Sequence, residues 1–222
     1  MAAPTSSYVL AEDMPAQAAI QIEKPELRQK KLYLAVKRAF DIVGSVLGII
    51  ILLIPMLIIA LVIVIDSPGD PIYSQERLGK NGKPFMIYKF RSMRLDAEAN
   101  GPQWAEECDP RCTRVGYVLR RTRLDELPQL LNILRGEMSF VGPRPEREHF
   151  YNEFEKYIPG FSNRLAVTPG LTGYAQVNGG YNLLPEEKIV YDMEYIERRS
   201  VWLDLKCIFE TVGILFSRDG SR

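Results

Sequence analysis

Two neighbouring carboxylates, Asp125 and Glu126, lie in the most arginine-rich part of the sequence. Between residues 111 and 147 there are eight arginines and only four acidic residues. Carboxylates bind hard cations such as Mg²⁺, and guanidinium groups bind phosphate oxygens. The combination predicts a site in which Asp125 and Glu126 hold a metal ion against a phosphate group. Two acids that only balance a helix macrodipole are the simpler interpretation, but they leave the arginines unexplained.

Several basic side chains are candidate phosphate ligands in this site. Arginines near the pair in the sequence are Arg120, Arg121, Arg123, Arg135 and Arg144. Of these, Arg120 precedes Asp125 by five residues, and Arg144 lies between two prolines that restrict its backbone. Lys89 and Arg91, in the segment YKFRSM, are further candidates. At their spacing they are also typical of the solvated face of a strand.

The acid pair is expected to lie at the start of a helix. Thr122 can act as the N-cap, Asp125 follows three residues later as an imperfect capping box, and Pro128 is tolerated in a first turn. The apolar face of this helix is expected to consist of Leu127, Leu130, Leu131 and Leu134.

A glycine-rich segment, PGLTGYAQVNG at residues 169–179, supplies a second set of candidates. Backbone N–H groups of residues 169–173 can bind a phosphate or a nucleobase. The candidate substrate ligands in the whole segment are Pro169, Gly170, Gln176 and Asn178. Taken alone, the pattern is more often an ordinary run of turns. Asp192 is either a substrate ligand or a buried acid paired with an arginine.

One long apolar run covers residues 42–65 and carries no charge. At about 1.5 Å per residue it can cross a hydrocarbon core of about 30 Å, so a single spanning helix is the default. However, Pro55 lies inside the run and is expected to break or kink the helix. Basic residues also flank the run on both sides, which suits a helix that enters the membrane, breaks at Pro55 and returns. The sequence itself leaves both forms open.

Composition excludes some other classes. The chain has 222 residues and a net charge of +0, which suits one domain with a membrane element. No nucleic-acid-binding motif accompanies the basic patch, so no nucleic-acid partner is expected. Cys108, Cys112 and Cys207 are odd in number and follow no signal peptide, which argues against a disulfide framework. With His149 as the single histidine, most Ser–His and Cys–His nucleophiles are excluded.

Residue periodicity and turn residues predict the remaining strands and helices. Strands are expected at 72–75 and 85–90, joined as a short β-hairpin, and helices at 146–157 and 184–198. Residues 201–216 are amphipathic and are expected to pack on the core or to lie in the membrane interface, with Trp202 and Phe216 as anchors. Residues 1–23 are expected to be flexible, and residues 95–112 irregular with helical pieces.

Three motifs occur in one order: LDELPQL, MSFVGPRP and PGLTGYAQVNG. In these the chain resembles the bacterial sugar transferase family, from about Lys37 to Phe216, and specifically its short-form monotopic phosphoglycosyl transferases. The resemblance implies an α+β fold: a mainly helical, membrane-associated catalytic domain with a short β-hairpin, anchored by one re-entrant segment. The expected division is a basic N-terminal segment (1–36), the re-entrant helix (37–66) and a cytoplasmic transferase domain (67–222).

The resemblance also implies a reaction. A sugar-1-phosphate would pass from a UDP-sugar to undecaprenyl phosphate with release of UMP, as the first membrane step of exopolysaccharide or glycoconjugate assembly. Asp125 would be the nucleophile that forms a phosphosugar intermediate, and Glu126 would bind Mg²⁺ or orient the site. The expected location is the bacterial inner membrane, in contact with membrane lipids and with the catalytic domain facing the cytoplasm.

Two other functions remain as alternatives. One is another nucleotide-sugar enzyme or a hydrolase, although adjacent acids are badly placed for a glycosidase, whose carboxyl groups must be about 5 Å or more apart. The other is a non-catalytic membrane scaffold of a polysaccharide export complex. The transferred sugar and the oligomeric state stay open, with a membrane-bound homodimer as one option.

Overall fold

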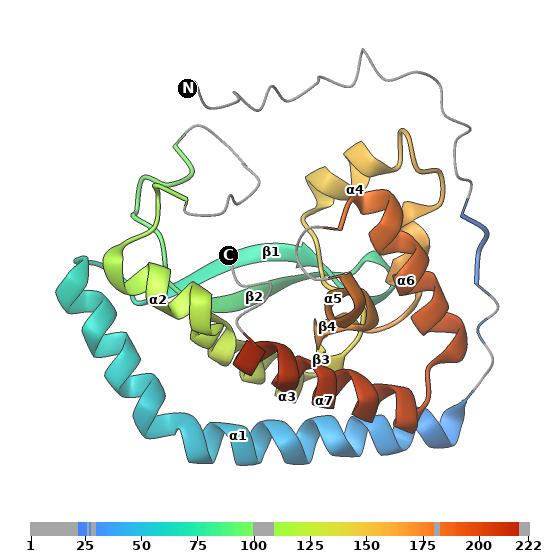
Figure 1. Ribbon diagram of the computed structural model, residues 1–222, viewed down its shortest axis with the longest axis horizontal. Helices are drawn as coiled ribbons and strands as arrows, with labels where there is room; N and C mark the ends of the chain where they lie inside the picture. The colour runs from blue at the N-terminus through green and yellow to red at the C-terminus, as the bar shows by residue number, and fades with distance from the viewer. Residues whose placement is uncertain (1–21, 26, 28–29, 100–108, 180–182, 218–222) are drawn as a thin grey trace.

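The computed structural model describes residues 22–25, 27, 30–99, 109–179 and 183–217. Most of them lie in helices, beside two small sheets (Figure 1), so the expectation of a mainly helical fold with a β-hairpin is confirmed. The elements are α1 (Lys31–Asp66), β1 (Ile72–Leu78), η1 (Lys80–Gly82), β2 (Pro84–Phe90), α2 (Arg114–Thr122), η2 (Leu124–Gln129), α3 (Leu130–Arg135), β3 (Ser139–Val141), α4 (Glu148–Phe154), η3 (Phe161–Ala166), β4 (Gly170–Thr172), α5 (Tyr174–Gly179), α6 (Pro185–Arg198) and α7 (Val201–Ser217).

Parts of the expected irregular segments lie outside the described residues. From the N-terminal segment 1–23 only Ile22 and Glu23 are described, and the Ile22 N–H donates to the Pro159 carbonyl at 2.8 Å. Residues 100–108, which belong to the expected irregular segment 95–112 and include Cys108, are outside the described part.

Both sheets have two strands. β1 and β2 pair antiparallel from Ile72 opposite Phe90 to Leu78 opposite Pro84, which confirms the predicted hairpin. Its turn is the 3₁₀ segment η1, in which Asn81 adopts a φ of 58° that asparagine tolerates better than most residues. The second sheet joins β3 and β4 in parallel, with Ser139 opposite Gly170. It was not predicted, because three-residue strands carry too little alternation to be recognised.

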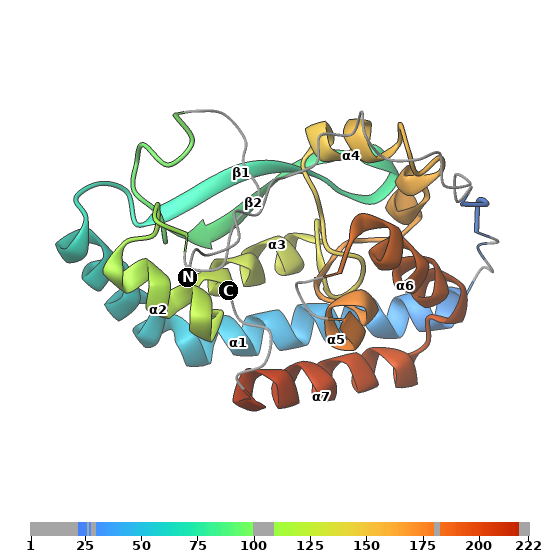
Figure 2. The same cartoon turned by 45° about the horizontal axis from the view of Figure 1, so that its top comes forward.

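Three clusters of buried apolar side chains form the core. The largest joins α4, η3 and α6 through residues such as Phe161 and Ile196. A second lies between β2 and α3, where Ile87 and Ile133 are buried, and a third joins α1, β2 and α2. In Figure 2 the hairpin lies at the top, α3 beneath it, and α1 and α7 at the base.

Helix α1 continues through Pro55 as one helix of 36 residues, and its ribbon changes direction in its cyan part (Figure 1). A proline removes one backbone hydrogen bond and kinks a helix without having to end it. One face packs on the core clusters, where Gly44 lies against Phe140 and Gly48 against Leu130. Within the described part of the chain, α1 is the one helix long and apolar enough to cross a membrane.

Candidate active site

The acid pair lies in the short helical segment that follows α2. Helix α2 is capped by Thr113, whose hydroxyl accepts from the Gly116 N–H at 2.9 Å, and it ends at Thr122. Arg123 then adopts a left-handed conformation with a φ of 58°, and η2 begins with Asp125 and Glu126 in its first turn. The prediction that the pair opens a helical segment is therefore correct.

The predicted cap and the predicted apolar face of this helix are partly wrong. Thr122 closes the preceding helix, since its hydroxyl donates to the Val118 carbonyl at 2.8 Å. The buried apolar side chains of α3 are Leu130 and Ile133, whereas Leu131 is 40 % exposed. The turn of 3₁₀ helix in η2 rotates the following residues away from a continuous α-helical register.

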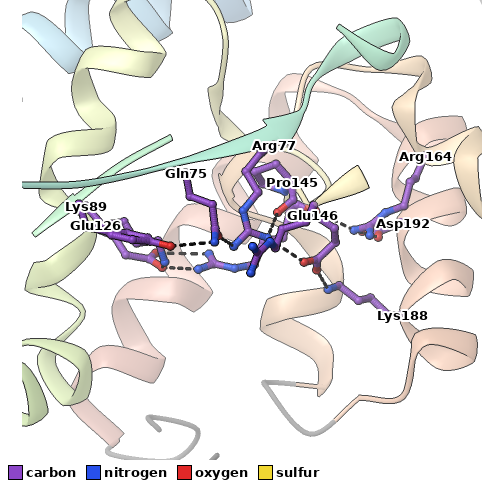
Figure 3. A network of polar contacts seen from close by, with 12 residues as sticks. Gln75, Arg77, Lys89, Glu126, Pro145, Glu146, Arg164, Lys188 and Asp192 are labelled. Carbon is purple, nitrogen blue, oxygen red and sulfur yellow. Dashed lines mark hydrogen bonds and ion pairs between the residues drawn. The ribbon is translucent and has the colours of Figure 1, made fainter. Parts of the chain in front are cut away.

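Glu126 is held by two cations. Its Oε1 lies 3.0 Å from the Lys89 Nζ, and both of its oxygens receive hydrogen bonds from the Arg144 guanidinium, with 3.3 Å between Nη1 and Oε2. Figure 3 shows Lys89 and Glu126 at one end of a line of charged side chains. Burial would raise the pKa of Glu126, but the charges of Arg144 and Lys89 outweigh burial and hold that pKa well below its usual value.

Asp125 is buried in the same place, with an exposed fraction of 7 %. Burial raises the pKa of Asp125 to about 6 against the opposing charge of Lys89, and the neighbouring Glu126 carboxylate adds to the rise. Its side chain receives no hydrogen bond from the described part of the chain. The Asp125 carboxylate is therefore ionised at neutral pH but poorly solvated, a state that favours its use as a ligand or nucleophile.

This burial predicts a pH-dependent stability difference between the protein and its Asp125→Asn variant. Because the folded-state pKa of about 6 lies above the ordinary value of 3.8, folding takes up a proton, and stability falls as pH rises through that interval. In metal-free buffer at pH 7.5 we expect the variant to be more stable by about 1–3 kcal/mol. At pH 4.5 most of this gain should be absent.

Thermal unfolding of both proteins between pH 4.5 and 7.5 measures this difference. Asp96→Asn, which removes a carboxylate whose side chain is 73 % exposed, is the matched control and should show little change. A variant less stable than the parent protein at pH 7.5 would contradict a buried, ionised Asp125.

The other arginine candidates lie at different distances from the pair. Arg120 contributes to the electrostatic field at Asp125, and its Nη1 lies 3.5 Å from the Cys112 sulfur. Arg91 is buried and donates to the carbonyls of Ser67 and Pro68, just after α1. Arg135 is exposed and donates to the Tyr88 hydroxyl at 2.9 Å. Of the basic candidates, Lys89 and Arg144 thus contact the acid pair through Glu126, whereas Arg91 binds backbone carbonyls just after α1.

The glycine-rich candidates form a separate unit around β4. Their backbone groups pair with the β3 segment: the Ser139 N–H donates to the Pro169 carbonyl, and the Gly170 N–H to the Pro143 carbonyl, each at 2.9 Å. A Cβ atom on Gly170 would lie 2.1 Å from the Gly142 nitrogen, so the close approach requires glycine. The side-chain amides of Gln176 and Asn178 donate to backbone carbonyls at 3.1 and 2.8 Å.

Asp192 lies in a second charged group that adjoins the first. It forms an ion pair with Arg164 at 2.6 Å, and both side chains are almost completely buried. The Arg164 guanidinium also donates to the Arg144 carbonyl at 3.0 Å. This arrangement agrees with the alternative of a buried acid paired with an arginine.

Sequence reasoning missed the side chains that join the two groups. Glu146 binds Arg77 at 3.3 Å and also Lys188, and both of its partners come from other elements (Figure 3). The charges of Lys188 and Arg77 outweigh burial and hold the pKa of Glu146 at about 2. Glu146 directly follows the MSFVGPRP motif, and this position was the only feature of the sequence that could have pointed to Glu146.

The donor set fits a magnesium ion that also binds substrate phosphate. Mg²⁺ is commonly held by one or two carboxylates, with substrate phosphate and water completing the octahedron. Asp125 and Glu126 are the two carboxylates that would hold such an ion. In the part of the chain that the structure describes, no group of three or more acidic, cysteine or histidine side chains could hold a metal without substrate.

Comparisons with known proteins identify relatives of the chain. The chain is 42 % identical over 194 residues to the UDP-N-acetylgalactosamine-undecaprenyl-phosphate N-acetylgalactosaminephosphotransferase of Aeromonas hydrophila, covering 86 % of this chain and 46 % of that protein. It is 53 % identical over 133 residues to the putative undecaprenyl-phosphate N-acetylgalactosaminyl 1-phosphate transferase of Bacillus subtilis, covering 60 % of this chain and 74 % of the relative.

A third relative carries a different sugar in its name. The UDP-glucose:undecaprenyl-phosphate glucose-1-phosphate transferase of Escherichia coli is 44 % identical over 182 residues, which are 79 % of this chain and 39 % of that protein. The chain thus spans less than half the length of the Aeromonas and Escherichia relatives. The model of the family described as "Bacterial sugar transferase" matches residues 32–218, and the chain belongs to this family.

Proposed function

We propose that the protein transfers a sugar-1-phosphate from a UDP-sugar to undecaprenyl phosphate and releases UMP. The observation that carries the proposal is the buried Asp125–Glu126 pair, with Lys89 and Arg144 bound to Glu126, in a chain of the sugar transferase family. Relatives are named for this reaction with undecaprenyl phosphate. Their names differ in the sugar, which leaves the donor to be found by experiment.

In the proposed mechanism Asp125 is first the nucleophile and then the leaving group at one phosphorus atom. An Asp125 carboxylate oxygen attacks the sugar-linked phosphorus, a new O–P bond forms, and the bond to UMP breaks with its electron pair leaving on the UMP oxygen. An oxygen of the lipid phosphate then attacks the same phosphorus and releases the carboxylate. Lys89 and Arg144 lie where they can neutralise phosphoryl charge once the substrate shares them with Glu126.

The proposed site includes Mg²⁺, held by Asp125 and Glu126. When bound, the ion supplies positive charge that offsets the repulsion between two anionic substrates and a carboxylate nucleophile. Arg120 is close enough to Asp125 to add to that field. The roles of Pro169, Gly170, Gln176 and Asn178 as ligands of the nucleotide stay a proposal, supported by their place in the glycine-rich unit.

The proposed location is the bacterial inner membrane, with the catalytic domain facing the cytoplasm. Helix α1 exposes large apolar side chains along its outer face, among them Ile50 (67 %), Ile51 (71 %) and Leu57 (62 %). Helix α7 lies beside α1 at the base of the fold in Figure 2, and it exposes Trp202 (80 %) and Phe209 (73 %). Such a surface suits contact with membrane lipids; of the two anchors expected on α7, the Phe216 side chain is outside the described part.

Contacts at both ends of α1 support the re-entrant form over a spanning helix. Near its start, the Lys37 Nζ pairs with Asp204 at 2.9 Å, and Arg38 donates to the last carbonyls of α3 at 2.7 Å. At its end, the Asp66 carboxylate accepts from the Val115 N–H at 3.2 Å. A helix held to one domain at both ends keeps both ends on one side of the membrane.

The proposed topology can be tested by cysteine accessibility. In a protein without native cysteines, new cysteines at Lys31 and Lys83 should both be labelled from the cytoplasmic side only. Replacement of Pro55 by Leu removes the kink and should favour a spanning helix, which would move one of the two labels to the periplasmic side. Ile54→Leu is the matched control. If both sites stay cytoplasmic in the Pro55→Leu variant, Pro55 does not determine the topology.

The experiment that tests the reaction is UMP release by the purified protein with Mg²⁺ and a panel of UDP-sugars, with and without undecaprenyl phosphate. We expect one sugar to be preferred and multiple turnovers to require the lipid. Without the lipid, release should stop near one UMP per chain, because the phosphosugar remains on the enzyme. If no UDP-sugar yields UMP in the presence of lipid and Mg²⁺, the scaffold alternative is favoured.

A further inference from the structure

A cavity of about 290 Å³ lies beside the first turns of α1. Its walls come from the start of α1, the hairpin turn η1, the segment between α3 and β3, the segment between η3 and β4, and the end of α6. In Figure 1 the start of α1 lies next to the junction of α6 and α7. None of the residues proposed above for catalysis or phosphate binding lines this cavity.

The lining is strongly basic. Four basic residues line the cavity against one acidic residue, Asp41; they are Lys37, Arg38, Lys80 and Arg199. The Asp41 carboxylate accepts from the Ser139 hydroxyl and the Phe140 N–H, each at 3.0 Å, so it is engaged by β3. An anion that entered the cavity would therefore meet mainly positive charge.

Lys80 is the cation that remains most available to a ligand. Its side chain is exposed in the hairpin turn, and among the described residues no carboxylate lies within ion-pair distance of it. By contrast, Lys37 pairs with Asp204, and Arg38 binds the last carbonyls of α3. The contacts of Lys37 and Arg38 hold these two side chains in the wall of the cavity, whereas the exposed Lys80 side chain lies at its edge.

The position of the cavity relative to the apolar run identifies the kind of anion. The α1 wall of the cavity contains Lys37, Arg38 and Asp41, within five residues of the start of the uncharged run at residue 42. This wall therefore adjoins the level where hydrocarbon meets head groups. Leu27 and Leu34, 44 % and 43 % exposed, add apolar surface to the lining. A ligand with a phosphate and the beginning of an apolar chain matches both kinds of surface.

We infer that this cavity binds the head group of an anionic phospholipid of the surrounding bilayer. The phosphate binds Lys80 within the positive field of Arg38 and Arg199, whose guanidinium groups also bind backbone carbonyls, and the glycerol end lies against Leu34. The inference rests on the membrane location in the proposed function. A neighbouring hollow shares Tyr33 and Arg199 with the cavity and includes Lys30 and Lys31, which extends the basic surface along the start of α1.

Thermal unfolding of the full chain in non-ionic detergent provides the test. Titration with dihexanoyl-phosphatidylglycerol should raise the unfolding temperature in a saturable way. Dihexanoyl-phosphatidylcholine and inorganic phosphate, at matched concentration and ionic strength, should have much smaller effects. Lys80→Ala should weaken the phosphatidylglycerol affinity about fivefold, the effect of removing one lysine near an anionic lipid surface. Lys83→Ala, an exposed lysine of the same turn that does not line the cavity, should stay within about twofold.

Three results would overturn the inference: equal stabilisation by phosphatidylcholine, equal stabilisation by inorganic phosphate, or an unchanged affinity in Lys80→Ala. The second result would assign the cavity to a free phosphate. UMP release by the same preparations separates this inference from the proposed function. Lipid stabilisation that depends on Lys80, in a protein that releases no UMP, would refute the reaction alone. UMP release without lipid stabilisation that depends on Lys80 would refute the lipid site alone.

Discussion

Replacement of Asp125 by Asn is expected to lower UMP release by at least about 10³-fold, since removal of a catalytic nucleophile has effects of this size or larger. The amide is nearly isosteric with the carboxylate and cannot form the bond to phosphorus. The fold should be retained, because Asp125 receives no hydrogen bond from the described residues and its burial as an anion is unfavourable. Initial rates with the preferred UDP-sugar, undecaprenyl phosphate and Mg²⁺ measure the effect.

A covalent intermediate provides the second measurement on the same variant. With UDP-sugar and no lipid acceptor, the parent protein should gain the mass of one sugar phosphate and release about one UMP per chain. The Asp125→Asn variant should do neither, and Asp96→Asn should behave like the parent. Near-normal UMP release by Asp125→Asn would remove the nucleophile assignment, and a mass adduct in that variant would move it to another residue.

The parts of the fold that the sequence predicted are those with a strong local signal. The hairpin follows from two apolar segments around a glycine-containing turn, and α6 from a proline at its start. In the segment predicted as a helix at 146–157, the rings of Phe150 and Phe154 stack at 6.0 Å, but Tyr157 at the same helical spacing is 45 % exposed. Periodicity alone does not give the width of a buried face.

The part of the site that the sequence predicted lies in recognisable segments, including YKFRSM with Lys89. Asp125, Glu126 and Arg144 lie in two motifs, and the structure brings them together. Lys188 and Arg77 carry no motif and reach Glu146 from elements more than 40 residues away in either direction. Such partners depend on tertiary packing, which a single sequence does not contain. Thr122 was misassigned because a threonine near acids fits the end of one helix as well as the start of the next.

The role of Asp192 is best decided by its stability effect. Asp192→Ala would leave the Arg164 charge completely buried opposite no carboxylate, since Asp192 is the one acid in ion-pair contact with Arg164 among the residues that the structure describes. Breaking a buried ion pair in this way costs about 3–5 kcal/mol, which corresponds to roughly 10 °C in unfolding temperature for a chain of this size. Glu194→Ala, on the same helix, removes an exposed ion pair with Arg198 and should cost less than about 1 kcal/mol.

A double replacement separates the structural role of Asp192 from substrate binding. Arg164→Met with Asp192→Leu removes both charges and should recover most of the lost stability, because an apolar pair of similar volume can replace a buried ion pair. The Arg164 guanidinium also supports the Arg144 carbonyl at 3.0 Å, so the double variant should still lower kcat through the position of Arg144. An unfolding temperature for Asp192→Ala within about 1 °C of the parent, together with a KM for UDP-sugar raised tenfold or more, would instead identify Asp192 as a substrate ligand.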